Sequence, residues 1–377
     1  MLNIGITGQA GFVGYHLFNK AKLDENFNLI NFEDDFFYNK DVLTSFVKEC
    51  DVIVHLAAVN RHHDQNEIFN KNIELVDRLI EAMRDTNSKA HVFFSSSTQE
   101  ERNNIYGNSK KAGREKLVNW ATENNSGFTG LIIPNVFGPF GRPFYNSVIS
   151  TFSHQVVIGD TPKVEVDATL NLIYVGELAD FIINKINTSY GKMEHECYVP
   201  HTFSIKVTDI LSKLIYFKEN YFEKGIIPKL EHNFDINLFN TFRSYIDNKS
   251  FYPVKYKKNS DNRGDFVEVM RLNIGGQVSF STTKPGIVRG NHFHTRKIER
   301  FAVIKGKALI QLRKIGTNEV LNFELDGNEP SYVDMPIWYT HNIKNIGDED
   351  LYTMFWINEF YNPEDPDTYF EAVEFEK

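Results

Sequence analysis

Hydrophobic residues recur with two different spacings along this chain. Up to about residue 246, short apolar runs alternate with longer stretches in which apolar residues return every three or four positions. Residues 51–58 are almost continuously apolar, which is typical of a parallel strand buried on both faces, and residues 68–84 repeat apolar positions along one helical face. Strands that alternate with helices predict an α/β fold with a doubly wound parallel sheet.

The second spacing begins at Asp265, where short apolar runs follow one another and Gly, Asn and Asp turns separate them. Many short strands without intervening helices predict an antiparallel sandwich or barrel. The stretch 247–264 between the two patterns is polar and rich in turn formers. We therefore expect one domain over residues 1–246 and an all-β domain over residues 247–377. The strands expected in the second domain are 266–270, 277–282, 301–304, 308–313, 322–325 and 351–357.

Composition excludes several classes of protein. The chain is 41% hydrophobic and 24% charged, as a globular protein with a full core should be. Its net charge of −9, without a long basic stretch, argues against nucleic acid or an anionic membrane as partner. Cys50 and Cys197 are the two thiols and imply neither a disulfide framework nor a thiolate metal site. There is no signal-like segment and no apolar run of about 18 residues, so we expect a cytoplasmic protein.

Three glycines at three-residue steps, Gly8, Gly11 and Gly14, follow the apolar strand at the start of the sequence. Glycines there permit a tight turn, close approach of the backbone to a pyrophosphate, and close packing of helix on strand. The helix that begins at Phe12 would point its first amides and its dipole at the phosphates. The loop therefore predicts a dinucleotide site, and the alternative is a plain turn that serves only packing.

An acidic run, Glu33-Asp34-Asp35, lies about twenty residues beyond the glycines. An acidic side chain at this point binds the hydroxyls of the adenosine ribose and repels a 2′-phosphate, which favours NAD over NADP. A solvated acidic turn is the alternative interpretation.

Tyr106 and Lys110 stand four residues apart, so on a helix they share one face. We expect the ammonium to lower the cost of ionising the phenol, which makes Tyr106 a candidate general acid or base. Lys110 can also hold the ribose of a nicotinamide, and a serine at the end of the preceding strand can hydrogen-bond a carbonyl oxygen. A surface pair is the alternative for an isolated Tyr-x-x-x-Lys. Here the pair follows the glycine loop, the Ala57-Ala58 strand end and a triple serine.

A cluster of metal-binding residue types lies in the second domain. His292 and His294 point to the same side of a strand, and Glu299 is expected to arrive from the next strand. His341 supplies a third imidazole. Three imidazoles and one carboxylate suit Zn²⁺ or another divalent transition metal rather than Ca²⁺. A domain that keeps this fold without a metal is the alternative.

The motifs Ser95-Ser96-Ser97 and Tyr106-Gly-Asn-Ser-Lys110 resemble those of the extended short-chain dehydrogenase/reductase family. The resemblance implies a catalytic role for Ser97, with Ser96 as second choice, alongside Tyr106 and Lys110. It also implies that Asn135 contacts a sugar nucleotide, although Ile133 stands where an arginine is common. The positions that it implies for cofactor binding are Gly8, Gly11, Phe12, Gly14, Asp41, Ala57, Ala58, Asn72, Tyr106 and Lys110.

The spacing G-x5-H-x-H-x4-E-x6-G, followed by P-x-W-x2-H-x3-N, resembles the two-part cupin signature, with Trp338 where glycine is usual. A short-chain reductase followed by a cupin barrel resembles the bifunctional capsular polysaccharide enzymes that lead to UDP-N-acetyl-L-fucosamine. That resemblance implies a zinc cupin that epimerises C3 of a UDP-2-acetamido-2,6-dideoxy-4-keto-hexose. It also implies a reductase domain that uses NADPH at C4, and a homodimer. The acidic run leaves NADH open. Two alternatives are a reductase whose cupin is only structural or dimerising, and a nicotinamide-sensing regulator without chemistry.

Overall fold

The computed structural model describes residues 1–262 and 264–374. The chain divides into two compact units, Met1–Thr151 with Val164–Ile210 and Phe152–Lys163 with Leu211–Lys377. Residues 211–246, which the sequence pattern groups with the first domain, belong to the second unit. Among the helices of the described residues, none is long and apolar enough to cross a membrane.

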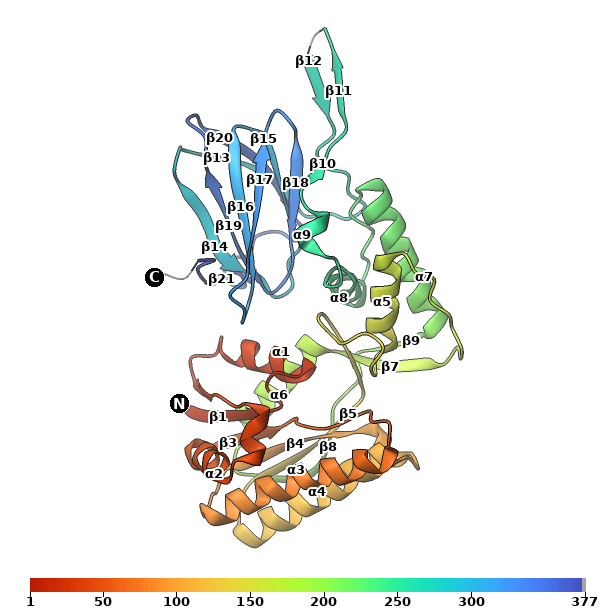
Figure 1. Cartoon of the computed structure of the whole chain (residues 1–377), viewed down its shortest axis with the longest axis vertical. Helices are drawn as coiled ribbons and strands as arrows, with labels where there is room; N and C mark the ends of the chain where they lie inside the picture. Colours follow the sequence, from red (N-terminus) through yellow and green to blue (C-terminus); the bar gives the residue numbers. More distant parts are fainter. Residues whose placement is uncertain (263, 375–377) are drawn as a thin grey trace. The chain divides into compact units, whose positions relative to one another are not determined.

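A six-stranded parallel sheet of order β2-β1-β3-β4-β5-β8 forms the centre of the first unit (Figure 1). Its order steps outward in both directions from β1, as in a doubly wound fold, so the expected α/β class is confirmed. The carboxyl ends of neighbouring parallel strands meet at one edge, where the loops that follow them come together. The strands are β1 (Leu2–Thr7), β2 (Phe27–Ile30), β3 (Val52–His55), β4 (His91–Ser97), β5 (Phe128–Ile133) and β8 (Met193–Tyr198).

Helices cover both faces of this sheet. One face packs against α2 (Lys40–Glu49), α3 (Gln65–Asp85) and α4 (Ile105–Asn124), and the other against α1 (Phe12–Ala21) and α6 (Val175–Ser189). The helices α2, α3 and α4 begin where Asn39, Asp64 and Asn104 accept a hydrogen bond from a backbone amide of the first turn. These caps fix where α4 starts, and therefore where Tyr106 and Lys110 lie.

Further elements complete the two units. A small sheet joins β6 (Asn135–Phe137), β7 (Thr169–Tyr174) and β9 (Phe203–Lys206). The helix α7 (Val207–Lys218) buries Ile210 and Leu214 and leaves Ile215 42% exposed. The remaining helices are α5 (Val148–Ile158), α8 (Asn233–Arg243) and α9 (Asn248–Phe251).

Two five-stranded antiparallel sheets, β10-β18-β15-β20-β13 and β17-β16-β19-β14-β21, make up the β part of the second unit (Figure 1). Their apolar side chains form one core that includes Ala302, Ile310 and Val333, so the expected all-β domain is confirmed. The strands are β10 (Val254–Lys255), β13 (Gln277–Thr283), β14 (Val288–Phe293), β15 (Glu299–Lys305), β16 (Lys307–Lys314), β17 (Val320–Asp326), β18 (Ser331–Met335), β19 (Tyr339–Asn345), β20 (Leu351–Ile357) and β21 (Tyr369–Phe370), with a separate hairpin of β11 (Lys258–Asp261) and β12 (Gly264–Val267).

Hydrogen bonds explain why α8 belongs with the β strands. Arg243 donates to the carbonyl of Met335 at 3.3 Å, and Asn240 donates to the carbonyl of Arg296 at 3.1 Å. The Arg243 and Asn240 side chains are buried, so they depend on protein partners in place of water. The sequence pattern shows the apolar face of this helix but not the partner on which it packs.

Candidate functional site

A cavity of about 1030 Å³ opens in the first unit, at the edge of the sheet where the carboxyl ends of β1, β3 and β4 meet. It brings together predicted residues from the glycine loop, from the ends of the strands and from α4. The predicted residues that line it are Gly8, Gly11, Phe12, Gly14, Ala58, Ser97, Tyr106, Lys110 and Asn135.

The glycine loop is tightly folded on its neighbours. Gly8 has φ +69°, and a Cβ there would lie 2.9 Å from the backbone of Ala57. A Cβ on Gly14 would lie 2.1 Å from the carbonyl oxygen of Gly8. Gly11 caps α1 without a side-chain hydrogen bond, so the first amides of this helix are open to an anion. These features fit the pyrophosphate of a dinucleotide.

Three residues predicted to contact the cofactor do not line the cavity. Ala57 lies under Gly8, and Asp41 is exposed in the first turn of α2. Asn72 is buried: its amide accepts from the Val59 amide at 2.7 Å, donates to the Val59 carbonyl at 3.1 Å and donates to Ser109 Oγ at 2.9 Å. Asn72 therefore fastens the segment after β3 to α4, and any contact of these residues with a cofactor stays a prediction.

The serines at the end of β4 differ in what their hydroxyls contact. Ser96 donates its proton to Glu100, which is paired with Arg114 at 2.7 Å. Ser97 Oγ accepts from the Gln99 amide at 3.2 Å, which leaves its own proton available to a ligand. This difference favours Ser97 over Ser96 for contact with a carbonyl oxygen. Ser95 receives a bond from Lys110 Nζ at 3.4 Å.

Burial controls the ionisation of the Tyr–Lys pair. It raises the pKa of Tyr106 well above the usual range, and the Tyr145 phenol adds to that shift. Burial also lowers the pKa of Lys110 to about 7, although the negative charge of Glu100 acts to raise it. The expected lowering of the phenol pKa by the ammonium is absent, because Nζ lies 5.9 Å from the ring centroid and loss of solvent dominates. Tyr106 therefore keeps its proton at neutral pH and is suited to donate it.

Two arginines that line the cavity were not singled out as site residues by the sequence pattern. Arg61 and Arg142 bring positive charge to it. Asp34, from the acidic run expected near the adenosine ribose, lines the cavity as well. Arg61 donates to the Phe144 carbonyl at 3.4 Å, and Arg142 lies 5.4 Å from the ring centroid of Tyr145. The only sequence signal for Arg61 is its position three residues after Ala58, at a strand end. Two guanidinium groups suit phosphate oxygens.

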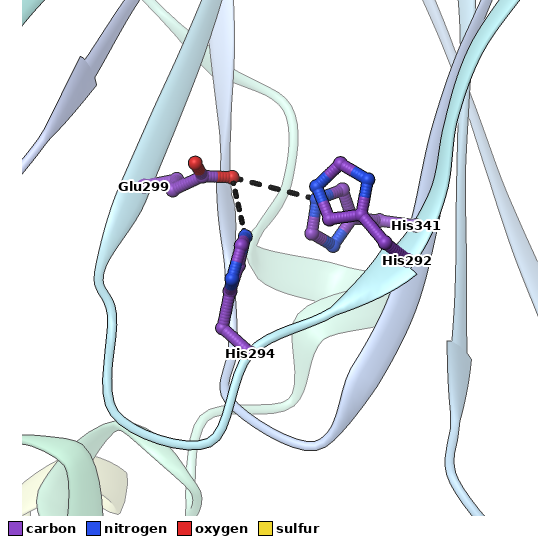
Figure 2. Close-up of side chains that lie close together, drawn as sticks. All are labelled: His292, His294, Glu299 and His341. Carbon is purple, nitrogen blue, oxygen red and sulfur yellow. Dashed lines mark ion pairs between the residues drawn. The ribbon is translucent and has the colours of Figure 1, made fainter. Parts of the chain in front are cut away.

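The four predicted metal ligands come together in the second unit (Figure 2). His292 lies on β14 with His294 just after it, Glu299 begins β15, and His341 lies on β19, opposite His292 in the ladder. One possible ligand atom from each residue lies within 4.8 Å of the others. Glu299 Oε2 lies 3.1 Å from His294 Nε2 and 3.4 Å from His341 Nε2.

The donor atoms fit a metal ion. His294 Nε2, Glu299 Oε2 and His341 Nε2 are buried without a hydrogen-bond partner, which is costly unless another ligand satisfies them. The Nδ1 atoms are instead bonded to backbone carbonyls, of Asp367 at 2.5 Å for His294 and of Tyr339 at 3.2 Å for His341. Burial lowers the pKa of His292 to about 4, so that imidazole is neutral, as a ligand must be. This set suits Zn²⁺ or a similar transition metal.

Trp338, which stands where the cupin pattern has glycine, keeps the conformation that favours glycine. Its φ is +61°, its amide donates to the His294 carbonyl at 2.8 Å, and its buried ring stacks on Phe293 at 5.5 Å between centroids. The departure from the pattern therefore preserves the turn beside the metal ligands.

Comparison with known proteins gives a consistent result. Residues 4–194 match the NAD dependent epimerase/dehydratase family, and residues 259–369 match the polysaccharide biosynthesis C-terminal domain. A Pseudomonas aeruginosa protein named UDP-2-acetamido-2,6-beta-L-arabino-hexul-4-ose reductase is 31% identical over 98% of both chains. The crystal structure of the capsular polysaccharide assembling protein CapF from Staphylococcus aureus is 32% identical, with a TM-score of 0.63 over 98% of this chain and 100% of that one. The Bacillus subtilis spore coat polysaccharide biosynthesis protein SpsL is 27% identical over 30% of this chain and 82% of its own.

Proposed function

Because this chain belongs to the NAD dependent epimerase/dehydratase family and carries a polysaccharide biosynthesis C-terminal domain, we propose that it is a nucleotide-sugar enzyme. We propose further that the enzyme is bifunctional. The substrate is a UDP-2-acetamido-2,6-dideoxy-4-keto-hexose on the route to UDP-N-acetyl-L-fucosamine in capsule or O-antigen synthesis. The second unit epimerises C3, and the first unit reduces the C4 ketone. The named reductase of P. aeruginosa, similar over 98% of both chains, supports this substrate class.

The observation that carries the reductase is that Ser97, Tyr106 and Lys110 line the same cavity as the glycine loop. A bound reduced nicotinamide supplies the hydride that the C4 carbon accepts. Tyr106 donates its phenolic proton to the keto oxygen as the alcohol forms, and Ser97 hydrogen-bonds the same oxygen. Lys110 would hold the nicotinamide ribose and Asn135 would contact the sugar nucleotide, and Arg61 and Arg142 offer guanidinium groups for its diphosphate.

The observation that supports the epimerase is the buried, four-residue donor set in the second unit. His292, His294, Glu299 and His341 would hold Zn²⁺ or another divalent transition metal. Such an ion, when bound, supplies Lewis-acid polarisation of the substrate's keto group. Glu299 would balance part of the ion's charge, and the backbone contacts of His294 and His341 leave their Nε2 atoms as the nitrogens that could bind it.

The chemistry fixes the order of the two steps. The C3 hydrogen is acidic only while C4 is a ketone, because its removal then gives an enolate. Return of the proton to the opposite face inverts C3. Hydride addition at C4 ends that acidity, so epimerisation precedes reduction and reduction traps the epimer.

The test supplies the 4-keto sugar nucleotide in heavy water, first without and then with a reduced nicotinamide. We expect deuterium at C3 without nicotinamide, loss of that exchange after chelation, and a 4-hydroxy product only when nicotinamide is added. Exchange that persists in metal-free protein would refute the metal epimerase. Failure to oxidise either reduced nicotinamide in the presence of the 4-keto sugar would refute the reductase.

We also propose a homodimer, which the resemblance to capsular polysaccharide enzymes implies. The edge strand β13 supports it, since Val278 and Phe280 are 48% and 72% exposed on one face of the sheet. Exposed apolar residues on a sheet edge are an association surface. Light scattering on the purified protein measures the mass, and a monomer at micromolar concentration would contradict the proposal.

A further inference from the structure

Asp367 lies just before β21, 73 residues beyond the metal-ligand candidate His294 with which it bonds. It is 1% exposed and has φ +39°, in the left-handed region that non-glycine residues avoid. A buried carboxylate in this conformation needs strong local bonds to persist. Those bonds all go to the turn that follows β14.

The carboxylate of Asp367 is saturated by donors from residues 295–297. Oδ1 accepts from the Thr295 amide at 3.1 Å and from Thr295 Oγ1 at 2.7 Å. Oδ2 accepts from the amides of Arg296 and Lys297, each at 3.0 Å. Because every contact is a donor facing an oxygen, an asparagine here would turn its NH₂ group against two donors.

The backbone carbonyl of Asp367 makes the contact that reaches the metal site. It lies 2.5 Å from His294 Nδ1, and since a carbonyl oxygen only accepts, Nδ1 must carry the proton. The other nitrogen, Nε2, is therefore the ring atom left to bind an ion, and it lies 3.1 Å from Glu299 Oε2, as Figure 2 shows. One residue thus fixes both the turn and the tautomer of a ligand.

Lys297 and Pro366 strengthen the same attachment. The buried Lys297 ammonium donates to the Pro366 carbonyl at 2.5 Å. Asp365, two residues before Asp367, pairs with Arg296 at 2.8 Å, but its side chain is 62% exposed. An exposed pair contributes little, so Asp365 provides a matched comparison within the same segment.

We propose that Asp367 is a positioning residue for the metal: it sets the tautomer and direction of His294, and the segment that carries it completes the metal site. The inference rests on the metal site of the proposed function. It concerns the affinity of that site for the ion rather than the reaction, so it can be tested without substrate.

The experiment titrates the metal-free full chain with Co²⁺ and follows the d–d absorption, with Zn²⁺ competition for affinity. We expect Asp367→Asn to bind Co²⁺ about 10- to 100-fold more weakly, the range typical of lost outer-sphere support. Asp365→Asn is expected to stay within about twofold of the parent protein. In ¹⁵N-histidine protein, the His294 resonance, identified by its loss in His294→Gln, should report an Nδ1-protonated ring that becomes a tautomer mixture in Asp367→Asn.

Co²⁺ affinity and a His294 tautomer unchanged by Asp367→Asn would overturn the inference while leaving the metal site intact. If the parent protein binds no Co²⁺ at all, the proposed metal epimerase fails, and this inference fails with it. Should Asp367→Asn lack native near-ultraviolet circular dichroism, Thr295→Val decides in its place, because it removes one donor and keeps the others. Weaker Co²⁺ binding by Thr295→Val then supports the inference, and parental affinity overturns it.

Discussion

Gly107 packs directly against the backbone carbonyl of Gln99. A Cβ on Gly107 would stand 2.0 Å from that oxygen, far inside van der Waals contact. Gln99 belongs to the 3₁₀ turn Thr98–Glu101, which follows Ser97, and Gly107 follows Tyr106 in α4. The contact between these two residues therefore sets the spacing between the serine and the tyrosine of the cavity.

Gly107→Ala should separate that turn from α4, because the obstacle is backbone and cannot rotate away. We expect ketone reduction to fall about 100-fold, as a displacement near 1 Å does elsewhere. Gly113→Ala is the control on the same helix: its Cβ would meet side-chain atoms of Phe94 and Val76 at 3.2 Å, which can adjust. Steady-state rates of both variants measure the effect, and equal rates would mean that the spacing is not critical.

Tyr106→Phe removes the proton donor and keeps the ring. Reduction should fall by about 10²- to 10⁴-fold, the contribution of general acid catalysis. Deuterium exchange at C3 should remain, because its donor set lies in the other unit. Full turnover by this variant would exclude Tyr106 as the acid.

Lys110→Met should raise stability at neutral and lower pH in the cofactor-free protein. The folded pKa of Lys110 is about 7 against 10.5 in the unfolded chain, so between these values the unfolded state binds more protons and the stability of the parent rises with pH. Below pH 7 Lys110 is protonated in both the folded and the unfolded state, and the free-energy cost of burying its charge is at its full value. We expect the variant to be more stable there by at least about 1 kcal/mol, with a gap that shrinks as pH rises to 10.5.

The control for this prediction is Lys116→Met, which removes an exposed lysine paired with Asp77 at 2.8 Å. In urea unfolding across this pH range, the difference in unfolding free energy between that variant and the parent should be nearly constant. If the difference in unfolding free energy between Lys110→Met and the parent were also constant with pH, burial of the Lys110 ammonium would not destabilise the fold as argued.

Asp34→Asn should shift the choice of nicotinamide. Asp34 lines the cavity at the start of the 3₁₀ turn Asp34–Tyr38 that follows β2, where a 2′-phosphate would add a like charge, whereas Asp35 does not line it. We expect NADPH affinity relative to NADH to rise about tenfold, the equivalent of ~1.4 kcal/mol. Fluorescence titration with both nucleotides measures the ratio, with Asp35→Asn as comparison. Equal shifts in the two variants would point to net charge instead of position.

Trp338→Gly tests a conflict between packing and backbone. Loss of a buried Trp side chain costs about 3–5 kcal/mol, and relief of the left-handed conformation returns about 1–2 kcal/mol. The loss of packing is larger than the relief of backbone strain. We therefore expect the unfolding free energy of the second unit, measured in urea, to fall by about 2 kcal/mol. A variant as stable as the parent would show that the stacking on Phe293 contributes little.

Sequence spacing was sufficient to predict the site residues whose relative positions depend only on the period of one helix or one strand. Tyr106 and Lys110 share a helical face, His292 and His294 lie one strand period apart, and all four line the sites expected of them. Both fold classes follow from the same alternation of apolar positions, whereas the strand order comes from the structure. Periodicity is a local property, and these predictions needed nothing more.

What the sequence could not supply depends on long-range contacts and on burial. Asp367 bonds a turn some seventy residues away, and no spacing rule connects the two. Arg61 and Arg142 line one cavity although they lie on separate loops. The ionisation of Tyr106 was predicted from its lysine neighbour, and the prediction was wrong because loss of solvent outweighs that charge. These three features depend on how segments far apart in the sequence fold together.

The attachment of His294 to Asp367 also has a consequence for how the protein is made. All four ligand side chains leave the ribosome before Asp367 does, because the last of them is His341. A nascent chain with every ligand in place still lacks the carbonyl that directs His294. At the proposed metal site, binding at full strength would then wait until the segment just before β21 has been synthesised.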